Sequence, residues 1–372
     1  MRVQLVDPSA FTPPYDHALC AALARAGADV ELVTSCFPYG SIPVPDGYRR
    51  SERFYRHVPG RAGSRLRRVG KAAAHVPEML AYRRAAARAA DVVHFQWLDL
   101  PWLDRYLLPA LPTLLTAHDV LPREPRPLQA RAQRALYDAV DAVVTHSEYG
   151  RRQLVDRLGL DPSRVHVIPH GAFTHLLEIP EHPLPEPLID PDQPVVLFFG
   201  LLRPYKGVET LLAAWRGIGD AELWIVGRPM MALQRLVAGA PPGVRCVTRF
   251  VSEGELAACF RRADVLVLPY SRTERFDQSG VLASALAFGK PVVLSDIGGF
   301  GEVAATGAGR LVPPDDVSAL HAALVEVLGD ASIRAEMAEA ARAAACGPYS
   351  WEAAAERTLE LYGALLSGRR GR

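Results

Sequence analysis

The chain has 372 residues, of which 49% are hydrophobic, 22% charged and 8% aromatic. This length exceeds what one hydrophobic core usually serves, so two domains are expected, and the composition excludes a mostly disordered chain. The 42 basic and 41 acidic residues nearly cancel. A dedicated nucleic-acid-binding protein is therefore not indicated, because the chain carries no global positive field.

The five cysteines are scattered and include no Cys-x-x-Cys pair; they are Cys20, Cys36, Cys246, Cys259 and Cys346. This pattern predicts free thiols rather than disulfides or a thiolate zinc site. The apolar stretch after Met1 is too short for a signal segment, and no uncharged apolar run approaches the roughly 18 residues of a membrane helix. We expect a cytoplasmic protein, with peripheral contact to the inner face of the membrane left open.

Short runs rich in β-branched residues alternate with longer stretches rich in Ala, Leu and Arg. The runs predicted as strands are Val3–Val6, Val30–Val33, Val92–Phe95, Leu114–Thr116, Ala142–Thr145, Val165–Ile168, Val195–Phe199, Glu222–Val226, Val244–Val247, Val265–Leu268 and Val292–Leu294. Helical patterns between them include Ala18–Arg25, Arg131–Ala139 and Val208–Trp215. This alternation predicts an α/β fold with parallel, doubly wound sheets.

Residues 169–194 interrupt the alternation with seven prolines. Such a density excludes a helix or a central strand, so the segment is interpreted as an interdomain linker. We predict a Rossmann-like N-terminal domain over 1–170, a linker over 171–194 and a second Rossmann-like domain over 195–349. A final helix over 350–372 is capped by Ser350. With two such domains, the cleft between them is the expected ligand site.

The loop after the strand at Val195 reads Gly200-Leu-Leu-Arg-Pro-Tyr-Lys-Gly207 and precedes an apolar helix. Arg203 and Lys206 bracket the helix start, where free amides and the helix dipole favour phosphate. Lysine is rare here, occurring only at positions 71, 206 and 290. The alternative is a solvated loop with two surface cations.

A second loop, Tyr270–Ser284, also ends in a helix that follows a strand. Ser279 and Gly280 open that helix, while Asp277 and Gln278 are candidates for bonding sugar hydroxyls. The alternative is an ordinary capped helix start, with Asp277 as the cap.

Residues 61–88 hold eight basic residues against one acidic residue, Glu78. This stretch either touches anionic lipid or a lipid-linked acceptor, or is the solvated face of a helix pair. Pro77 is expected to interrupt any single long helix here.

Nine segments of the chain together form a recognisable set. In the second half they are Gly200 to Gly207, Ile225-Val-Gly227, Ala263–Pro269, Ala287–Val293 and Gly298–Glu302. In the first half they are Thr116–Asp119, Val144–Glu148 and Val167–Gly171, and near the end of the chain stands Tyr349-Ser-Trp351. These segments resemble the family 4 glycosyltransferases of GT-B fold, whose final crossing helix begins at the position of Tyr349-Ser-Trp351. The resemblance covers nearly the whole chain in the family's order.

The resemblance implies retaining transfer of a hexose from a nucleotide diphosphate sugar, a UDP- or GDP-sugar, to a hydroxyl acceptor without an obligatory metal or other cofactor. Arg203 and Lys206 would hold the diphosphate, and His118 would lie near the reacting centre. The implied donor-binding residues are Gly200, Asp277, Gln278, Ser279, Gly280, Val281, Leu282, Ser284 and Glu302. His146 and His170 also follow strands; they are secondary candidates for the cleft, and we favour a structural role for both.

Two departures from the family pattern stand out. The family's paired glutamates would fall at Phe276 and Ser284, neither of which is acidic. Asp277 or Glu274 is the candidate replacement for the sugar contact, and Ser284 retains a hydroxyl for the ribose. The family's Gly-Gly loop is replaced by Ser9–Tyr15, in which two prolines remove backbone donors.

Other readings stay open. An epimerase or a phosphorylase would use the same fold, although a phosphorylase would need a cofactor lysine, for which only Lys206 and Lys290 are available. A non-catalytic homologue that binds a glycan or a partner would explain the lost glutamates. No His, Asp or Glu spacing predicts a metal site.

Overall fold

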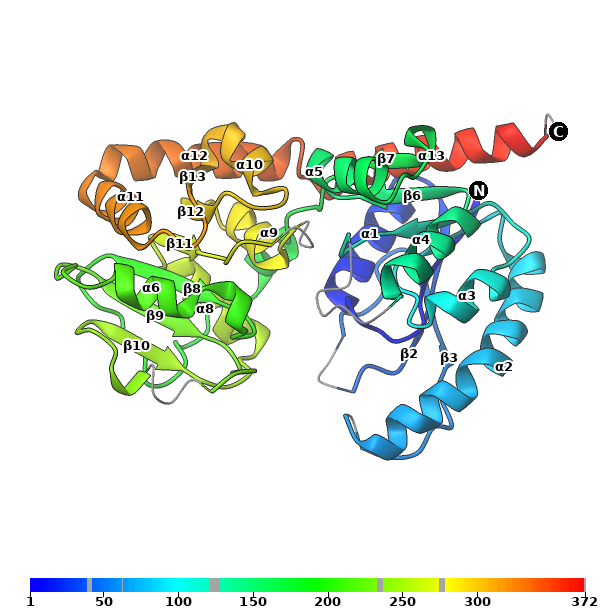
Figure 1. Ribbon diagram of the computed structural model, residues 1–372, viewed down its shortest axis with the longest axis horizontal. Helices are drawn as coiled ribbons and strands as arrows, with labels where there is room; N and C mark the ends of the chain where they lie inside the picture. Colours follow the sequence, from blue (N-terminus) through cyan, green and yellow to red (C-terminus); the bar gives the residue numbers. More distant parts are fainter. Residues whose placement is uncertain (39–41, 62, 121–127, 233–236, 274–277, 371–372) are drawn as a thin grey trace. The chain divides into compact units, whose positions relative to one another are not determined.

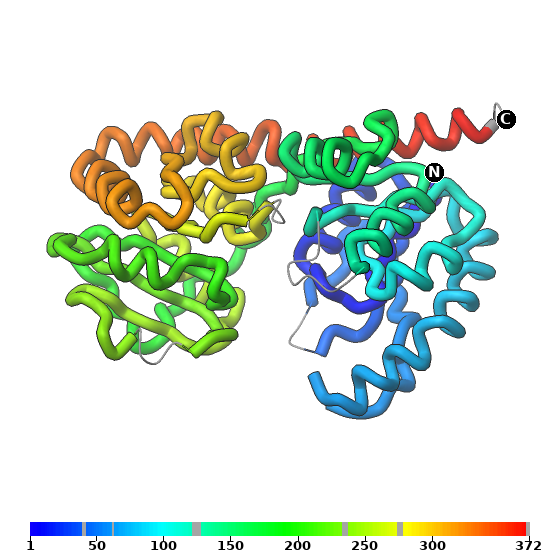
Figure 2. Tube along the Cα trace, in the orientation of Figure 1, coloured from blue at the N-terminus to red at the C-terminus, as the bar shows by residue number. Residues whose placement is uncertain are grey.

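A computed structural model describes residues 1–38, 42–61, 63–120, 128–232, 237–273 and 278–370. The chain forms two compact units (Figures 1 and 2). Unit 1 comprises Met1–Gly171 together with Trp351–Arg372, and unit 2 comprises Ala172–Ser350. The C-terminal segment thus returns to the first unit.

Unit 1 is built on a seven-stranded parallel sheet in the order β3-β2-β1-β4-β5-β6-β7. The strands are β1 (Arg2–Asp7), β2 (Asp29–Ser35), β3 (Arg49–Phe54), β4 (Val92–Phe95), β5 (Thr113–Thr116), β6 (Ala142–Thr145) and β7 (Val165–Val167). Strands β4, β5 and β6 are buried at every position, because helices cover both faces of a doubly wound sheet. The predicted α/β fold is confirmed.

The helices of unit 1 are α1 (Pro13–Arg25), α2 (Arg65–Ala89), α3 (Pro101–Leu107), α4 (Gln129–Ala139), α5 (Glu148–Arg152) and α13 (Trp351–Arg370), with short turns η1 (Gln153–Arg157) and η2 (Pro162–Arg164). Helix α13 packs along α1. Its Tyr362 hydroxyl lies 2.7 Å from Nδ1 of the buried His94. At its start, a Cβ on Gly171 would come within 2.3 Å of the Trp351 indole, so glycine permits this packing.

The expected interruption at Pro77 is wrong. Helix α2 runs unbroken from Arg65 to Ala89 with Pro77 inside it. Pro77 is exposed, whereas His75, Met79, Tyr82 and Ala86 face the core. The buried face stabilises the helix across the proline, because the carbonyl that loses its donor can reach water.

Unit 2 holds a six-stranded parallel sheet in the order β10-β9-β8-β11-β12-β13. The strands are β8 (Val195–Phe199), β9 (Glu222–Val226), β10 (Val244–Val247), β11 (Val265–Leu268), β12 (Val292–Ser295) and β13 (Gly309–Val312). The helices are α6 (Val208–Ala214), α8 (Glu253–Arg262), α9 (Gly280–Ala287), α10 (Phe300–Val303), α11 (Val317–Gly329) and α12 (Ala331–Cys346), with turns η3 (Thr174–Glu178), η4 (Pro204–Lys206) and η5 (Ala304–Ala308).

The proline-rich segment lies on unit 2 from Ala172 onward. The Ala172 amide donates to the Tyr349 carbonyl at 2.7 Å, and Leu188 is buried in the core of that unit. Turn η3 contacts both α8 and α9. The backbone here is held by packing, although the prolines give it no regular ladder.

Two properties concern the chain as a whole. All five cysteines are free. None of the helices in the described ranges is long and apolar enough to cross a membrane.

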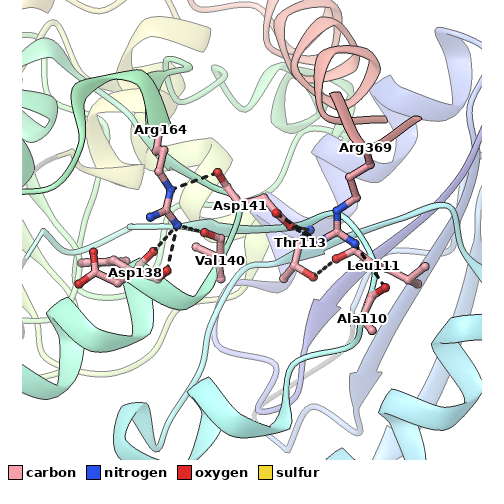
Figure 3. Close-up of polar contacts among 9 residues, drawn as sticks. Ala110, Leu111, Thr113, Asp138, Val140, Asp141, Arg164 and Arg369 are labelled. Atoms are coloured by element: carbon pink, nitrogen blue, oxygen red, sulfur yellow. Dashed lines mark hydrogen bonds and ion pairs between the residues drawn. The ribbon is translucent and has the colours of Figure 1, made fainter. Parts of the chain in front are cut away.

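Arg164 stabilises the end of α4. Its guanidinium donates to the carbonyls of Tyr137 at 3.3 Å and Asp138 at 3.1 Å, and to that of Val140 (Figure 3). Figure 3 also shows Arg369 of α13 bonded to Asp141, at 2.9 Å to Oδ2. A cation at a helix C-terminus satisfies carbonyls that lack intrahelical donors and complements the helix dipole.

We predict that Arg164→Ala lowers the free energy of unfolding of unit 1 by about 1–2 kcal/mol, because half-buried bonds from a charged donor are lost. Urea unfolding followed by tryptophan fluorescence measures this. Arg131→Ala is the matched control, since Arg131 is exposed on α4, and its effect should stay within about 0.5 kcal/mol. Equal stabilities of the two variants would contradict the assignment.

Candidate active site

The loop from β1 to α1 turns its amides inward. The Asp7 carboxylate accepts from the amides of Ser9 (3.2 Å), Phe11 (2.6 Å) and Thr12 (3.2 Å). The remaining amide of this stretch, at Ala10, bonds the Asp7 carbonyl at 3.2 Å. The next two residues are prolines and have no N–H. This loop therefore presents side chains, not backbone donors, to a ligand.

Asp7 has a second carboxyl group beside it. Asp16 of α1 is buried and hydrogen-bonds to Asp7. Burial, followed by the neighbouring Asp7, holds the pKa of Asp16 well above its usual value. Asp16 is thus the protonated member of the pair at neutral pH and donates to Asp7, which leaves the Asp7 oxygens charged for the three loop amides.

Three histidines gather at the carboxyl ends of β5, β6 and β7. His118, His146 and His170 all have ring centroids within 5.4 Å of the buried Tyr15 ring. His118 also stacks on Trp97, with centroids 4.9 Å apart and planes 12° from parallel. The structure therefore brings together the three histidines singled out in the sequence.

Hydrogen bonds fix the tautomers of this cluster. His146 Nδ1 lies 3.0 Å from the Ile168 carbonyl, which can only accept, so Nδ1 carries the proton. In neutral His146, Nε2 is then an acceptor, and it lies 3.2 Å from Nδ1 of His118. His118 must therefore donate from Nδ1. Its Nε2 then carries a lone pair and lies 3.1 Å from the Gln96 amide oxygen.

The amide of Gln96 completes this chain of bonds. Gln96 is fully buried, and its Nε2 has no partner among the described residues. With the side-chain amide of Gln96 flipped by 180°, its NH₂ group donates to the lone pair on Nε2 of His118. Both ring nitrogens of His118 are then used within unit 1, so the ring is held rigidly against Trp97.

Burial keeps the cluster neutral. Burial, and then the neighbouring His146, holds the pKa of His118 well below its usual value. Burial likewise lowers the pKa of His146 to about 4 and that of His170 to about 3. The expected interpretation of His146 and His170 as structural is consistent with these contacts and stays a prediction, as does the site role of His118.

In unit 2 the loop after β8 approaches neighbouring backbone closely. A Cβ on Gly207 would lie 1.8 Å from the Pro269 carbonyl oxygen, and Gly207 has a φ of +71°. Gly200, with a φ of +108°, would place a Cβ 2.8 Å from the Lys206 Nζ and 3.2 Å from the Val281 side chain. Both positions require glycine, and they bring the Lys206 amine to the start of α9.

Lys206 is buried, and its Nζ lies 5.3 Å from the centroid of the Tyr270 ring. Arg203, at the start of η4, is half-buried and has no side-chain bond to the described residues. The first intrahelical bond of α9 runs from Ala283 to the Ser279 carbonyl at 3.0 Å. The amides of Gly280, Val281 and Leu282 therefore have no intrahelical acceptor.

The remaining residues predicted to bind the donor lie around the start of α9. Gln278 Nε2 donates to the Gly299 carbonyl at 3.2 Å, and the Glu302 amide donates to the same carbonyl at 3.2 Å. The Ser284 hydroxyl donates to the Gly280 carbonyl at 3.1 Å, so Ser284 has only acceptor capacity left. Asp277, Glu274 and Phe276 lie outside the described residues.

The structure adds residues that sequence reasoning missed, namely Asp7, Asp16, Gln96 and Trp97. Asp7, Gln96 and Trp97 stand at or directly after a carboxyl strand end, the position that already singled out His118, so the same signal would have found them. Within the described ranges, no group of three or more His, Cys, Asp or Glu side chains is placed to hold a metal ion.

We predict that the neutral cluster makes unit 1 sensitive to acid. A histidine with a lowered folded pKa binds its proton only in the unfolded chain, at pH values between about 6.5 and the folded pKa. Its contribution to stability is therefore present above pH 6.5 and is lost as the pH falls, at about 1.4 kcal/mol per pH unit. Between pH 6.5 and 5, His146→Gln should reduce the slope of the unfolding free energy against pH by about 1.4 kcal/mol per pH unit, which corresponds to one proton fewer taken up on unfolding.

The slope of the variant is compared with that of the wild type, because Asp7 and Asp16 are present in both. Their pKa values are raised, so they change the slope in the direction opposite to the histidine. His57→Gln is the control, since His57 is exposed, and it should leave the slope unchanged. An unchanged slope in His146→Gln would contradict a neutral His146. In parallel, nitrogen NMR of the imidazoles should show His118 protonated at Nδ1.

Comparison with known proteins identifies the family. The family described as Glycosyltransferase Family 4 matches residues 15–175, and the one described as Glycosyl transferases group 1 matches residues 193–330. Among solved structures, sucrose-phosphate synthase from Thermosynechococcus elongatus superposes with a TM-score of 0.74 at 20% identity, covering 99% of this chain and 100% of that one. Anabaena HepE in complex with UDP-glucose gives 0.71 at 17% identity, covering 98% and 100%.

Curated relatives are closer in sequence. The D-inositol 3-phosphate glycosyltransferase of Xylanimonas cellulosilytica is 31% identical over 94% of this chain and 90% of its own length. The alpha-maltose-1-phosphate synthase of Mycolicibacterium smegmatis is 32% identical over 74% of this chain and 79% of its own. The sites assembled at the two strand edges and these matches lead to one conclusion: the chain is a glycosyltransferase and belongs to family 4, with the GT-B fold.

Proposed function

We propose that this glycosyltransferase moves a hexose from a nucleotide diphosphate sugar to a hydroxyl acceptor with retention of anomeric configuration. Unit 2 binds the donor, and unit 1 binds the acceptor. The observation that carries the donor assignment is the Lys206 amine beside Gly200 at the start of α9, next to three amides without intrahelical acceptors. A cation and a helix N-terminus at one point favour a diphosphate.

A solved structure of the same fold supports a UDP-sugar as donor, and a GDP-sugar is the alternative within the proposal. Anabaena HepE, which shares the fold, was solved with UDP and with UDP-glucose. One relative is a phosphatidyl-myo-inositol mannosyltransferase, which carries a lipid in its acceptor's name. The same names favour transfer over an epimerase, a phosphorylase or a non-catalytic homologue. For this chain the sugar and the base are part of the proposal.

The charges in unit 2 suit the proposed step. As the bond from the anomeric carbon to the diphosphate oxygen breaks, negative charge grows on the leaving group and positive charge on the sugar ring. Arg203, Lys206 and the amides of Gly280–Leu282 stabilise the former. The acceptor oxygen bonds to the same face of the anomeric carbon, and its proton passes to the leaving phosphate oxygen. This step needs neither a carboxylate nucleophile nor a metal ion.

We propose that His118 acts as a neutral imidazole, and that Gln278, Ser284 and Glu302 support the binding of the donor. A neutral imidazole avoids placing a second positive charge near the developing cation of the sugar ring. In the same proposal Asp277, which lies outside the described residues, bonds the sugar hydroxyls in place of the missing glutamate.

We predict that Arg203→Ala and Lys206→Ala each lower kcat about 10²- to 10³-fold, because electrostatic donors of this kind are worth about 2.7–4 kcal/mol in the transition state. Turnover of a panel of UDP- and GDP-hexoses measures this, with thermal unfolding as a check on folding. The matched control is Arg216→Ala, an exposed cation of unit 2, which should keep wild-type turnover. Wild-type rates in both test variants would rule out the diphosphate assignment.

Peripheral contact with an anionic membrane is also proposed, through α2. Its first turns expose Leu66 and Val69, at 62% and 64%, and each follows an exposed cation, Arg65 or Arg68. Apolar side chains flanked by arginines suit the interface of an anionic bilayer. Lys71 and Arg67 of the same stretch are half-buried and turn toward protein atoms, Ser9 Oγ and the Val58 carbonyl.

We predict that the protein sediments with vesicles containing anionic lipid, and that 1 M salt releases it, because the Debye length then falls to about 3 Å. Leu66→Ser with Val69→Ser should weaken sedimentation, as should Arg65→Ser with Arg68→Ser. Arg83→Ser, further along α2, is the control with a smaller effect. Equal binding to neutral vesicles, or none to either kind, would leave the stretch as a solvated face.

A further inference from the structure

Tyr270 is the second residue after β11, and only 1% of its surface is exposed. Its ring meets that of Tyr205 in turn η4 edge to face, with centroids 5.6 Å apart, and lies 5.5 Å from the ring of Phe300 at the start of α10. Its hydroxyl lies 3.4 Å from Oγ of Ser279, the residue before α9. One buried side chain therefore contacts three segments that contribute to the proposed donor site.

The backbone around Lys206 is fixed by the loop after β11. The Ser271 amide of that loop donates to the Tyr205 carbonyl at 2.8 Å. The Pro269 carbonyl of the same loop comes so close to Gly207 that a Cβ there would lie 1.8 Å from its oxygen. Backbone contacts thus hold both neighbours of Lys206 in the chain, so the position of its ammonium group depends on what surrounds the side chain.

The ring of Tyr270 and the backbone at Gly200 both border that ammonium group. Nζ of Lys206 lies 5.3 Å from the centroid of the Tyr270 ring, within the range of a cation–π interaction. A Cβ on Gly200 would stand 2.8 Å from Nζ. Lys206 is buried, so its long side chain has given up rotamer freedom that an exposed lysine would lose on binding an anion.

We infer, on the basis of the proposed function, that Tyr270 is a positioning residue for the transfer step. Its ring face holds the Lys206 ammonium at the start of α9, where the leaving diphosphate gains negative charge. A cation that is already in place stabilises this charge without moving during the reaction. The hydroxyl of Tyr270 contributes less, because 3.4 Å to Ser279 is long for a bond between hydroxyl groups.

The first measurement is turnover of UDP- and GDP-hexoses by the full chain. Tyr270→Leu should lower kcat about tenfold, the equivalent of about 1.4 kcal/mol, because leucine is apolar but has no π-face. Tyr270→Phe keeps the face and should restore kcat to within about threefold of the wild type. In a Lys206→Ala background, Tyr270→Leu should cost less than about threefold more, because the two residues act as a pair. A further tenfold loss there would contradict the positioning role.

The second measurement does not depend on turnover. Lysine occurs only at positions 71, 206 and 290, so protein labelled with ¹³C-lysine gives three Hε–Cε signals. An aromatic face shields protons above it, so the Lys206 signal should lie upfield of that of Lys290, which bonds a carbonyl. The upfield shift should persist in Tyr270→Phe and disappear in Tyr270→Leu. Lys71, whose Nζ lies 4.7 Å from the centroid of the Tyr55 ring, is the internal control and should not change. The same Lys206 shift in Tyr270→Leu would overturn the contact.

Phe260→Leu is the matched control for loss of a buried ring in unit 2. Phe260 contacts Phe199 and Phe288 in the core, with ring centroids 5.3 and 5.5 Å apart. Its variant should lower thermal stability as Tyr270→Leu does, yet keep kcat and the Lys206 signal of the wild type. An equal loss of kcat in Phe260→Leu would show that any core ring matters and would overturn the positioning role. If neither UDP nor GDP binds wild-type protein that shows the upfield Lys206 signal, the proposed function fails while the contact stands.

Discussion

A parallel sheet delivers the carboxyl ends of all its strands to one edge, and both units place their polar groups there. Strands buried on both faces must be apolar along their length, so chemistry can begin only where each strand stops. In unit 1 this edge carries Asp7, Gln96, His118 and His146. In unit 2 it carries Gly200 and the loop that leads to Lys206. The location of both sites follows from the direction of the strands.

The two edges have opposite electrostatic characters. In unit 2, glycines at 200 and 207 allow close backbone approach and bring a buried lysine to the start of α9. In unit 1, the amides of the loop after β1 donate to Asp7, and burial keeps the histidines neutral. In the proposed function, the lysine and the helix start of unit 2 suit the diphosphate of the donor.

The sequence predicted the central strands because they are buried and β-branched, and it predicted the loops of both sites from their position after those strands. It missed β3 and β13, for different reasons. Strand β3 is a polar edge strand, Arg49–Phe54, whose side chains are mostly half-exposed, so it lacks an apolar run. Strand β13 begins with Gly309 and Arg310 and is similarly exposed. Edge strands are specified by pairing with a neighbour, which a local pattern does not contain.

Burial of a polar group also depends on partners distant in sequence. No local pattern links Asp7 to Asp16, or shows that Pro77 would sit on the exposed side of an otherwise anchored helix. The chain of bonds from Ile168 through His146 and His118 to Gln96 needs four strand ends to be adjacent. Only the sheet order β4-β5-β6-β7 provides that.

In the proposed function, that chain of bonds suits the histidines to a role other than proton transfer. A histidine that exchanges protons near neutral pH needs one accessible nitrogen and a pKa close to 7. His118 has both nitrogens engaged and a pKa held far below that value. Its flat ring instead supports Trp97, and the carbonyl of Ile168 keeps the whole series in one tautomeric state. Positions 118 and 146 therefore need a flat side chain that stays uncharged. A neutral histidine meets this need, because one of its ring nitrogens donates a hydrogen bond and the other accepts one.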